Sequence, residues 1–285
     1  MGLKSVYVKI QIKVFLMKTF RSVLSIVVYK ISRFTKKNLL SDFFLLMRFL
    51  FSWNFAKDRK IRYINKFELR IYSQNGEDGI LQTIFYKIGT KNRYFVEFGV
   101  GDGNECNTRF LKEAHNWKGL WMDAKYKSND IKKELVTKEN VEKLFKKYKV
   151  PKNFDLLSID IDGNDYWVWE AIKYYKPRVV VIEYNSVYPP PIKVAVKYDA
   201  NFEREADNYF GASLSDLEAL GREKGYTLIA CDSNGINAFF VRSNLVKDRF
   251  LIDTIVNIYK PPKFGLKLDG KYVGYKKSKR EMISI

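Results

Sequence analysis

Short apolar runs alternate with helical patterns along most of the chain beyond about residue 70. Uninterrupted apolar runs are typical of strands in a parallel sheet that helices cover on both faces. Such runs predict strands at 94–98, 119–122, 155–159 and 179–182. The periodicity between them predicts helices that begin near residue 75 and cover about 107–114, 167–172 and 213–221.

The later part of the pattern indicates how the sheet closes. Two further apolar runs, 226–230 and 238–241, flank Asn234-Gly235 and predict an antiparallel hairpin. A short strand is also expected near 135–136, within a lysine-rich stretch, 125–149, that otherwise predicts solvated helices. The segment from Tyr188 to about residue 210 carries three prolines at its start and is long enough to be a substrate lid.

The first strand leads into an acidic residue, Glu97, and then into three glycines at alternate positions, Gly99, Gly101 and Gly103. Glycines at a strand end expose backbone N–H groups and let a ligand approach the main chain closely. A dinucleotide fingerprint would place its third glycine one residue later and its acid well downstream. An acid inside the turn repels phosphate but can receive an ammonium group. The pattern therefore favours S-adenosylmethionine (SAM), which is cationic at its amino-acid end and carries no phosphate.

A second acid, Asp123, follows the second predicted strand, where a carboxylate can bind both ribose hydroxyls. With this acid in place, the pattern predicts an α/β fold with a doubly wound, mostly parallel, seven-stranded sheet. This is the class I SAM-methyltransferase (Rossmann-like) type, here with a closing antiparallel hairpin and an N-terminal helical extension.

Acidic and amide side chains follow the last two strands of the parallel set. Asp160 and Asp162 follow one strand, and Glu183 with Asn185 ends the next. Because ligands of open α/β sheets bind at the carboxyl ends of strands, Asp160, Asp162 and Glu183 are candidate catalytic residues. Crowded carboxylates repel unless a proton or a cation offsets them. Asp160, Glu183 and Asn185 are therefore candidate ligands of Mg²⁺ or Mn²⁺. The alternative is that these acids line the pocket and that 162–165 caps the next helix.

Charge is concentrated at the start of the chain. Residues 1–70 hold 16 Lys and Arg against three acids, and so carry +13 of the formal net charge of +19. Two apolar stretches in this region are too short to span a bilayer. Basic, aromatic-rich helices of such length lie on anionic membrane surfaces, or they pack on protein. No nucleic-acid reader motif accompanies the charge, so nucleic acid is an unfavoured partner.

These observations divide the chain into a basic extension (1–66), a catalytic domain (67–245) and a basic tail (246–285). Two cysteines among 285 residues cannot form a disulfide framework. We therefore expect a cytoplasmic protein, either free or peripheral on the inner face of a membrane. The sequence leaves the oligomeric state open, with a homo-oligomer as one alternative.

Taken together, the motifs resemble FkbM-type SAM-dependent methyltransferases, and more narrowly a branch that carries the blocks SQNGEDG and SIDIDGND. The resemblance covers roughly 70–243. The matching blocks are 73–79, 95–99, 107–111, 155–165, 181–185, 211–214 and 235–240. It implies that Glu97, Gly99, Gly101 and Asp123 bind SAM, with Gln74 and Glu77 at the border of the same pocket.

The resemblance also implies methyl transfer to a hydroxyl of a glycan or related acceptor. In better-known members the fourth strand is followed by Asp-x-Glu-Gly, whereas this chain has Asp160-Ile161-Asp162-Gly163. The shorter acid leaves more room, so the substrate is not carried over. Either Asp160 or Asp162 would act as the base, or a metal would acidify the hydroxyl. Two other functions remain alternatives: a non-catalytic scaffold of the same fold at a membrane, and a nucleic-acid methyltransferase.

Overall fold

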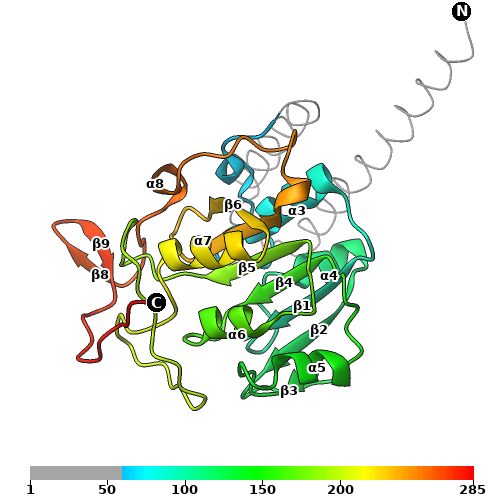
Figure 1. Cartoon of the computed structure of the whole chain (residues 1–285), viewed down its shortest axis with the longest axis horizontal. Helices are drawn as coiled ribbons and strands as arrows, with labels where there is room; N and C mark the ends of the chain where they lie inside the picture. Colours follow the sequence, from blue (N-terminus) through cyan, green and yellow to red (C-terminus); the bar gives the residue numbers. More distant parts are fainter. Residues whose placement is uncertain (1–59) are drawn as a thin grey trace, which may run out of the picture.

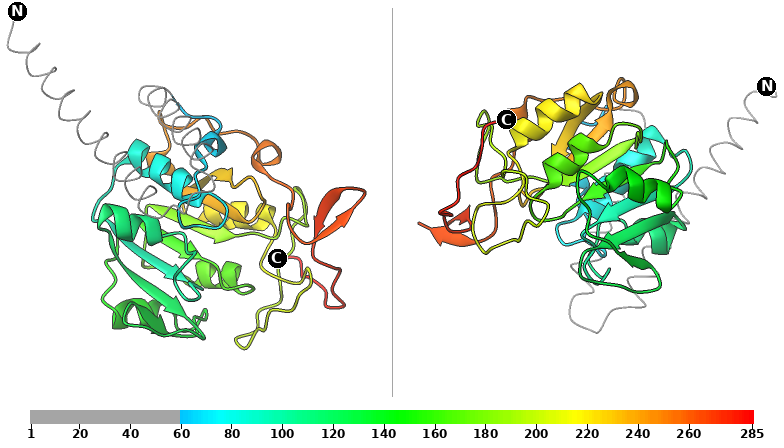
Figure 2. Two further views of the ribbon diagram at one scale, coloured as in Figure 1. Left: turned by 180° about the vertical axis from the view of Figure 1, so that it is seen from behind. Right: turned by 60° about the horizontal axis from the view of Figure 1, so that its bottom comes forward.

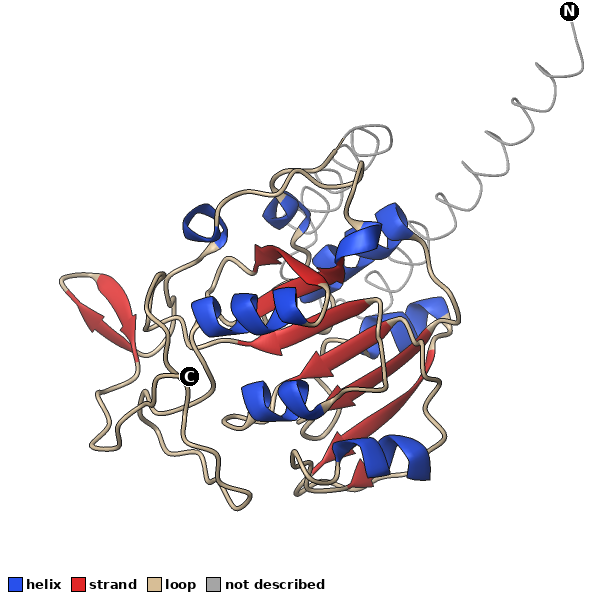
Figure 3. Cartoon of the chain, in the orientation of Figure 1, coloured by secondary structure: helices blue, strands red, loops and turns tan. Residues whose placement is uncertain are grey.

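The structure is a computed structural model that describes residues 60–285. The basic extension predicted over 1–66 lies outside the described residues except for its last part. The centre of the molecule is a seven-stranded sheet with the order β3-β2-β1-β4-β5-β7-β6 (Figures 1 and 3). All neighbouring strands are parallel except β7, which is antiparallel to both β5 and β6. This order and the antiparallel β7 confirm the predicted class I SAM-methyltransferase type of fold.

The strands of this sheet lie close to the predicted apolar runs. They are β1 (Tyr94–Phe98), β2 (Lys118–Asp123), β3 (Ile131–Lys133), β4 (Leu156–Ile159), β5 (Val179–Glu183), β6 (Tyr226–Cys231) and β7 (Asn237–Arg242). One prediction is wrong: the short strand is formed by Ile131–Lys133, not by 135–136. Ile131 and Val136 are both buried, in different cores, but only Ile131 pairs with a strand residue, Trp121 of β2, so burial of an apolar side chain did not identify the strand.

Helices cover both faces of the sheet (Figures 1 and 2). On one face lie α5 (Val141–Lys147), α6 (Asp165–Ala171) and α7 (Leu214–Glu223), and on the other lie α3 (Glu77–Ile88) and α4 (Arg109–His115). Successive strand residues point to opposite faces, so neighbouring residues such as Val180 and Val181 enter different cores. This is why the strands are apolar throughout. The lysine-rich 125–149 contributes β3 and the single helix α5 rather than several helices.

The segments around the sheet extend both cores. The 3-10 helix η1 (Ile64–Phe67) packs with α3, and Phe250 joins the same core. The residues after β7 form a second 3-10 turn η2 (Ser243–Leu245), a short helix α8 (Ile255–Ile258) and a separate hairpin of β8 (Leu266–Leu268) and β9 (Lys271–Gly274). Among residues 60–285, no helix combines the length and the apolar character needed to cross a bilayer.

The predicted lid has no helix or regular strand between 184 and 213. Two isolated bridges connect it to the C-terminal residues, Ala195 with Ile283 and Asp207 with Lys276. Lid and tail therefore lie side by side at the end of the sheet to which the parallel strands point (Figure 1).

Candidate functional site

A cavity of about 190 Å³ opens at the carboxyl ends of β1 and β4. Its lining comes from the turn before α3, the glycine turn after β1, the end of β4 and the start of β7. The lining residues are Gln74, Asn75, Glu77, Glu97, Gly99, Val100, Gly101, Asp102, Glu105, Cys106, Asn107, Asp160, Ile236 and Asn237. The structure thus brings together all but one of the residues predicted to bind a cofactor.

The cavity is strongly acidic. The lining that the described residues provide has five carboxylates, Glu77, Glu97, Asp102, Glu105 and Asp160, and no Lys, Arg or His. The chain has a formal net charge of +19, so the charge of the cavity is opposite to that of the whole protein. Such a lining attracts a cationic ligand and repels phosphate groups.

Glu97 is fully engaged by the protein itself. One carboxylate oxygen accepts from the Asn107 backbone N–H at 2.8 Å, and the other accepts from the Thr108 N–H at 3.1 Å and the Thr108 hydroxyl at 2.5 Å. The Ser158 hydroxyl adds a bond of 3.2 Å from β4. Burial raises the pKa of Glu97, and these bonds oppose that rise. Glu97 therefore ties the start of α4 to the ends of two strands.

Glycine is needed at two positions of this turn for different physical reasons. A Cβ on Gly99 would lie 1.5 Å from the Asp160 carbonyl oxygen, so Gly99 is required by the close approach of β4. A Cβ on Gly101, at φ +57°, would meet nothing within 4 Å and would project into open space. Only Gly101 matches the predicted reason, room for a ligand beside the main chain.

Asp123 does not line the cavity, although it is adjacent to it. One oxygen accepts from the Gly101 N–H at 2.8 Å, and the other accepts from the N–H groups of Lys125 and Tyr126. The carboxylate thus fixes the glycine turn at the end of β2. Its predicted contact with ribose stays a prediction.

Glu77 and Gln74 occupy the border that the resemblance implies. Glu77 is buried and accepts from the Asn75 N–H and from the side-chain amide of Asn237, at 2.8 Å each. Gln74 lies at the exposed rim, where its amide donates to Glu105 at 3.2 Å. Asn237 also lines the cavity. It belongs to the block 235–240 that carries the family resemblance, but no sequence pattern predicted a role for it at the site.

The three predicted catalytic carboxylates form a cluster. Ligand oxygens of Asp160, Asp162 and Glu183 all lie within 4.8 Å of one another. Burial, together with the surrounding acids, raises the pKa of Asp160 and of Glu183 well above the usual range. One oxygen of Glu183, Oε2, is buried and has no hydrogen-bond partner among the described residues. The cluster can therefore hold a proton at neutral pH, or a cation in its place.

The predicted metal ligand Asn185 is bonded elsewhere. Its amide nitrogen donates to the carbonyls of Asn208 and Phe210 at 2.9 Å each, and its amide oxygen accepts from the Val187 N–H at 3.2 Å. These bonds hold the end of the lid to β5. Asn185 as a metal ligand stays a prediction.

The turn after Asp160 agrees in part with the alternative interpretation, in which residues 162–165 cap the next helix. Asp165 accepts from the N–H groups of Ile161 and Gly163 at 2.9 Å each and opens α6. Asp162, at φ +63°, points outward to Arg204, whose Nε lies 3.9 Å from its carboxylate. Arg204 comes from the irregular lid, where no sequence pattern indicated it.

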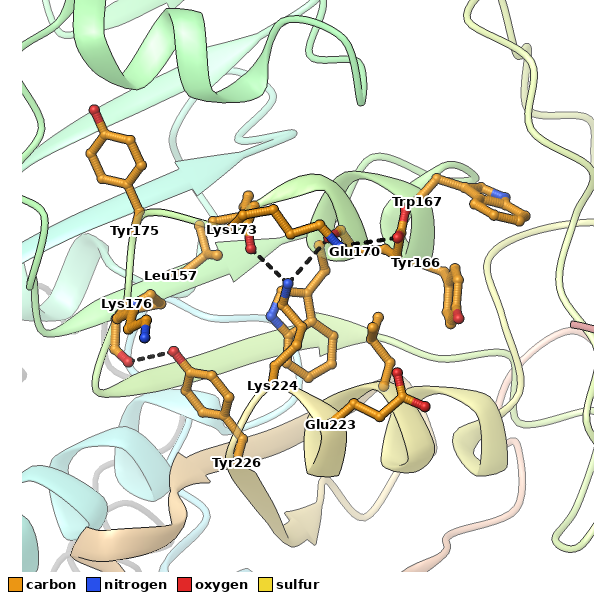
Figure 4. A pocket seen from close by; sticks show the side chains of 14 residues that line it. Leu157, Tyr166, Trp167, Glu170, Lys173, Tyr175, Lys176, Glu223, Lys224 and Tyr226 are labelled. Atoms are coloured by element: carbon orange, nitrogen blue, oxygen red, sulfur yellow. Dashed lines mark hydrogen bonds and ion pairs between the residues drawn. The ribbon is translucent and has the colours of Figure 1, made fainter.

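A second hollow of about 530 Å³ lies between α6 and α7, toward the amino end of β5 (Figure 4). Lys224 follows α7 and donates to the carbonyls of Glu170 and Ile172 at 3.2 and 2.6 Å. Burial lowers the pKa of Lys224 to about 8. The lysine thus caps the end of α6, and none of the predicted site residues lies here.

No family model matches the chain, and no curated protein matches it. Solved structures with a similar fold include a SAM-dependent methyltransferase from Clostridium acetobutylicum ATCC 824, with 12% identity over 59% of this chain and 92% of that one and a TM-score of 0.32. LepI in complex with SAM is 13% identical over 70% of this chain, with a TM-score of 0.35. This chain spans 63% of LepI. Likeness at this level assigns no activity to this chain.

Proposed function

We propose that the chain is a SAM-dependent methyltransferase. The observation that carries this proposal is the charge of the cavity: among residues 60–285, its lining has five carboxylates and no basic side chain, in a chain with a formal net charge of +19. SAM carries a sulfonium and an ammonium group against one carboxylate, so its net charge is positive and it has no phosphate. It therefore suits this lining, whereas the phosphates of ATP or NAD would be repelled. A cavity of about 190 Å³ is smaller than the roughly 300 Å³ of sites that bury a whole ligand. We therefore assign it to the charged end of SAM.

The acceptor would be a hydroxyl, with Asp160 as the base. SAM supplies a methyl group on its sulfonium when bound. Asp160 lines the cavity and belongs to the carboxylate cluster, so its carboxylate can take the proton of a hydroxyl held between the two. Burial and the surrounding acids raise the pKa of Asp160, so its carboxylate binds a proton more readily than an exposed aspartate does. Asp162 and Glu183 would share the proton.

A divalent cation is a further part of the proposal. Three carboxylates with oxygens within 4.8 Å suit Mg²⁺ or Mn²⁺, and the partnerless Oε2 of Glu183 offers a buried ligand atom. The guanidinium of Arg204 competes with a cation for Asp162. Loss of activity on chelation, with recovery on adding Mg²⁺, would support the cation. Unchanged activity would leave Asp160 as the base without a metal.

A glycan is the acceptor class that the surroundings of the cluster favour. Half-buried aromatic rings follow the acidic turn: Phe202 lies directly over Gly163, and Tyr198 packs edge-on against Trp167 at 6.3 Å. Aromatic rings with a polar edge suit the mixed apolar and hydroxyl faces of sugars. Membership of the FkbM branch, a cytoplasmic location and membrane contact through 1–66 belong to the same proposal.

Calorimetry with SAM tests the central step. We expect saturable binding of SAM by the full-length chain and no binding of ATP at the same concentrations. No heat of binding with millimolar SAM would overturn the proposal. Release of S-adenosylhomocysteine in the presence of hydroxyl acceptors then tests turnover, and binding without any turnover would favour the scaffold alternative.

A further inference from the structure

The C-terminal hairpin of β8 and β9 projects away from the body of the protein (Figures 1 and 2). All three residues of β8 are exposed, including Leu266 at 52% and Leu268 at 62% of their full accessible surface. Tyr272 of β9 is also exposed at 40%. The two leucines alternate with Lys267 and so share one face of the strand. A two-stranded hairpin is marginally stable alone in water, and among residues 60–285 none covers the face of the two leucines.

Lysines surround this apolar face. Residues 263–279 contain six lysines and one acid, Asp269, which gives a net charge of +5. All six lysines are exposed. The ammonium nitrogen of Lys267 lies 4.5 Å from the centre of the Tyr272 ring, a cation–π contact at an exposed site. The hairpin therefore combines apolar and cationic groups.

The root of the hairpin is held against the lid. Tyr275 packs against Phe264 at 5.2 Å and edge-on against Phe210 at 6.1 Å. Arg204, which reaches Asp162 of the carboxylate cluster, also lies over the Tyr275 ring at 4.9 Å. A continuous set of contacts thus connects the hairpin to the site at the carboxyl edge of the sheet.

We propose that the β8–β9 hairpin docks on a bilayer that contains anionic phospholipid. The leucines would enter the interface while the lysines contact headgroups, as in other basic interfacial segments. A second copy of the chain would bring like charges together. A nucleic acid would use the lysines but would leave the leucines in water. Docking would turn the carboxyl edge of the sheet, with its cavity and carboxylate cluster, toward the membrane.

A fluorophore on the hairpin tests this directly in the full-length chain. Leu268→Cys is labelled with an environment-sensitive dye, because the two native cysteines are buried. We expect a blue shift and a gain of intensity with vesicles of phosphatidylcholine and phosphatidylglycerol. Tyr174→Cys is the matched control, since Tyr174 is 76% exposed in the loop between α6 and β5, near the amino end of β5. Its dye should not respond.

Other results would overturn the inference. They are vesicle flotation without a change at position 268, a response to single-stranded RNA equal to that with vesicles, or a response that rises with protein concentration alone. Combined Leu266→Ser and Leu268→Ser should weaken vesicle affinity roughly tenfold or more, because two leucines leave the interface. SAM affinity, measured separately, should not change in these variants, so failure of docking and failure of the proposed function are distinguishable.

Discussion

Two regions at the carboxyl edge of the same sheet surround their acidic side chains in opposite ways. At the ends of β1 and β2, Glu97 and Asp123 are met by backbone N–H groups that the fold provides for them. At the ends of β4 and β5, Asp160 and Glu183 face mainly other carboxylates, and one oxygen of Glu183 has no partner in the described part of the chain.

The difference indicates which carboxylates are available for proton transfer or for binding a cation or substrate. A carboxylate that accepts several backbone hydrogen bonds is fixed in place, and removing it leaves buried donors unsatisfied. A carboxylate without such bonds keeps its oxygens available for a proton, a cation or a substrate, at a cost in stability. We therefore expect substitutions at β1 to affect folding and substitutions at β4 and β5 to affect the reaction.

The largest expected effect is on turnover, in Asp160→Asn. The amide has the same shape but cannot take the hydroxyl proton, so the rate of methyl transfer should fall roughly 10²- to 10⁴-fold. The melting temperature at pH 7 should rise, because one member of a repelling cluster is neutralised. Release of S-adenosylhomocysteine and thermal unfolding measure the two effects. A variant with full activity, or one that is less stable than the native protein, would break the comparison.

The next largest effect is on folding, in Glu97→Ala. The substitution leaves the N–H groups of Asn107 and Thr108 without an acceptor, and the Thr108 and Ser158 hydroxyls lose theirs. We expect a loss of about 3 kcal/mol or more in the free energy of unfolding. Urea denaturation measures it. Glu97→Gln keeps one acceptor oxygen and should lose less; equal stability of all three proteins would contradict the structural role.

Much of this fold could be predicted because its strands are apolar on both faces and end at polar residues. The positions of most strands along the chain, the glycine turn after β1 and the acids at the strand ends follow from that pattern. The strand at 131–133 was misplaced because three residues with one buried side chain, Ile131, leave too little periodicity to detect.

The sequence predicted which acids lie together at the strand ends, but it did not predict their hydrogen bonds, the position of Asp123 outside the cavity, or the presence of Asn237 in its lining. The sequence places Glu97 and Asp160 at neighbouring strand ends, yet it does not say which one the backbone N–H groups will meet. That depends on the turn geometry of 103–108, which brings two N–H groups to Glu97. Arg204 and the aromatic rings of the lid come from irregular chain, where packing and not periodicity decides the position.

A third test concerns pH and Glu183. Burial and the neighbouring Asp160 raise the pKa of Glu183 well above 4.5, so the folded protein holds a proton that the unfolded chain releases. The resulting stability is complete below pH 4.5 and is lost as pH rises through the folded pKa. The slope is at most about 1.4 kcal/mol per pH unit for one proton. In Glu183→Gln, urea denaturation at a series of pH values should show a flatter decline. An unchanged slope would mean that this region carries no shared proton.

The smallest expected effect is on SAM affinity, in Gly101→Ala. Comparison with Gly89→Ala separates a role of the glycine turn in binding from a role in folding. Both glycines have positive φ, +57° and +70°, and in both cases a Cβ would meet nothing within 4 Å. Both substitutions should lower the free energy of unfolding, because an L-residue is strained at positive φ. The loss should be roughly 1–2 kcal/mol at Gly101 and larger at Gly89, whose ψ of 177° lies in a region that almost only glycine adopts. Only Gly101 lines the acidic cavity, so only Gly101→Ala should also weaken SAM binding, by several-fold in calorimetry. Gly89 ends α3, away from the cavity, and its variant controls for strain alone. Equal SAM affinity in the two variants would remove Gly101 from the binding site and leave the turn with a purely structural role.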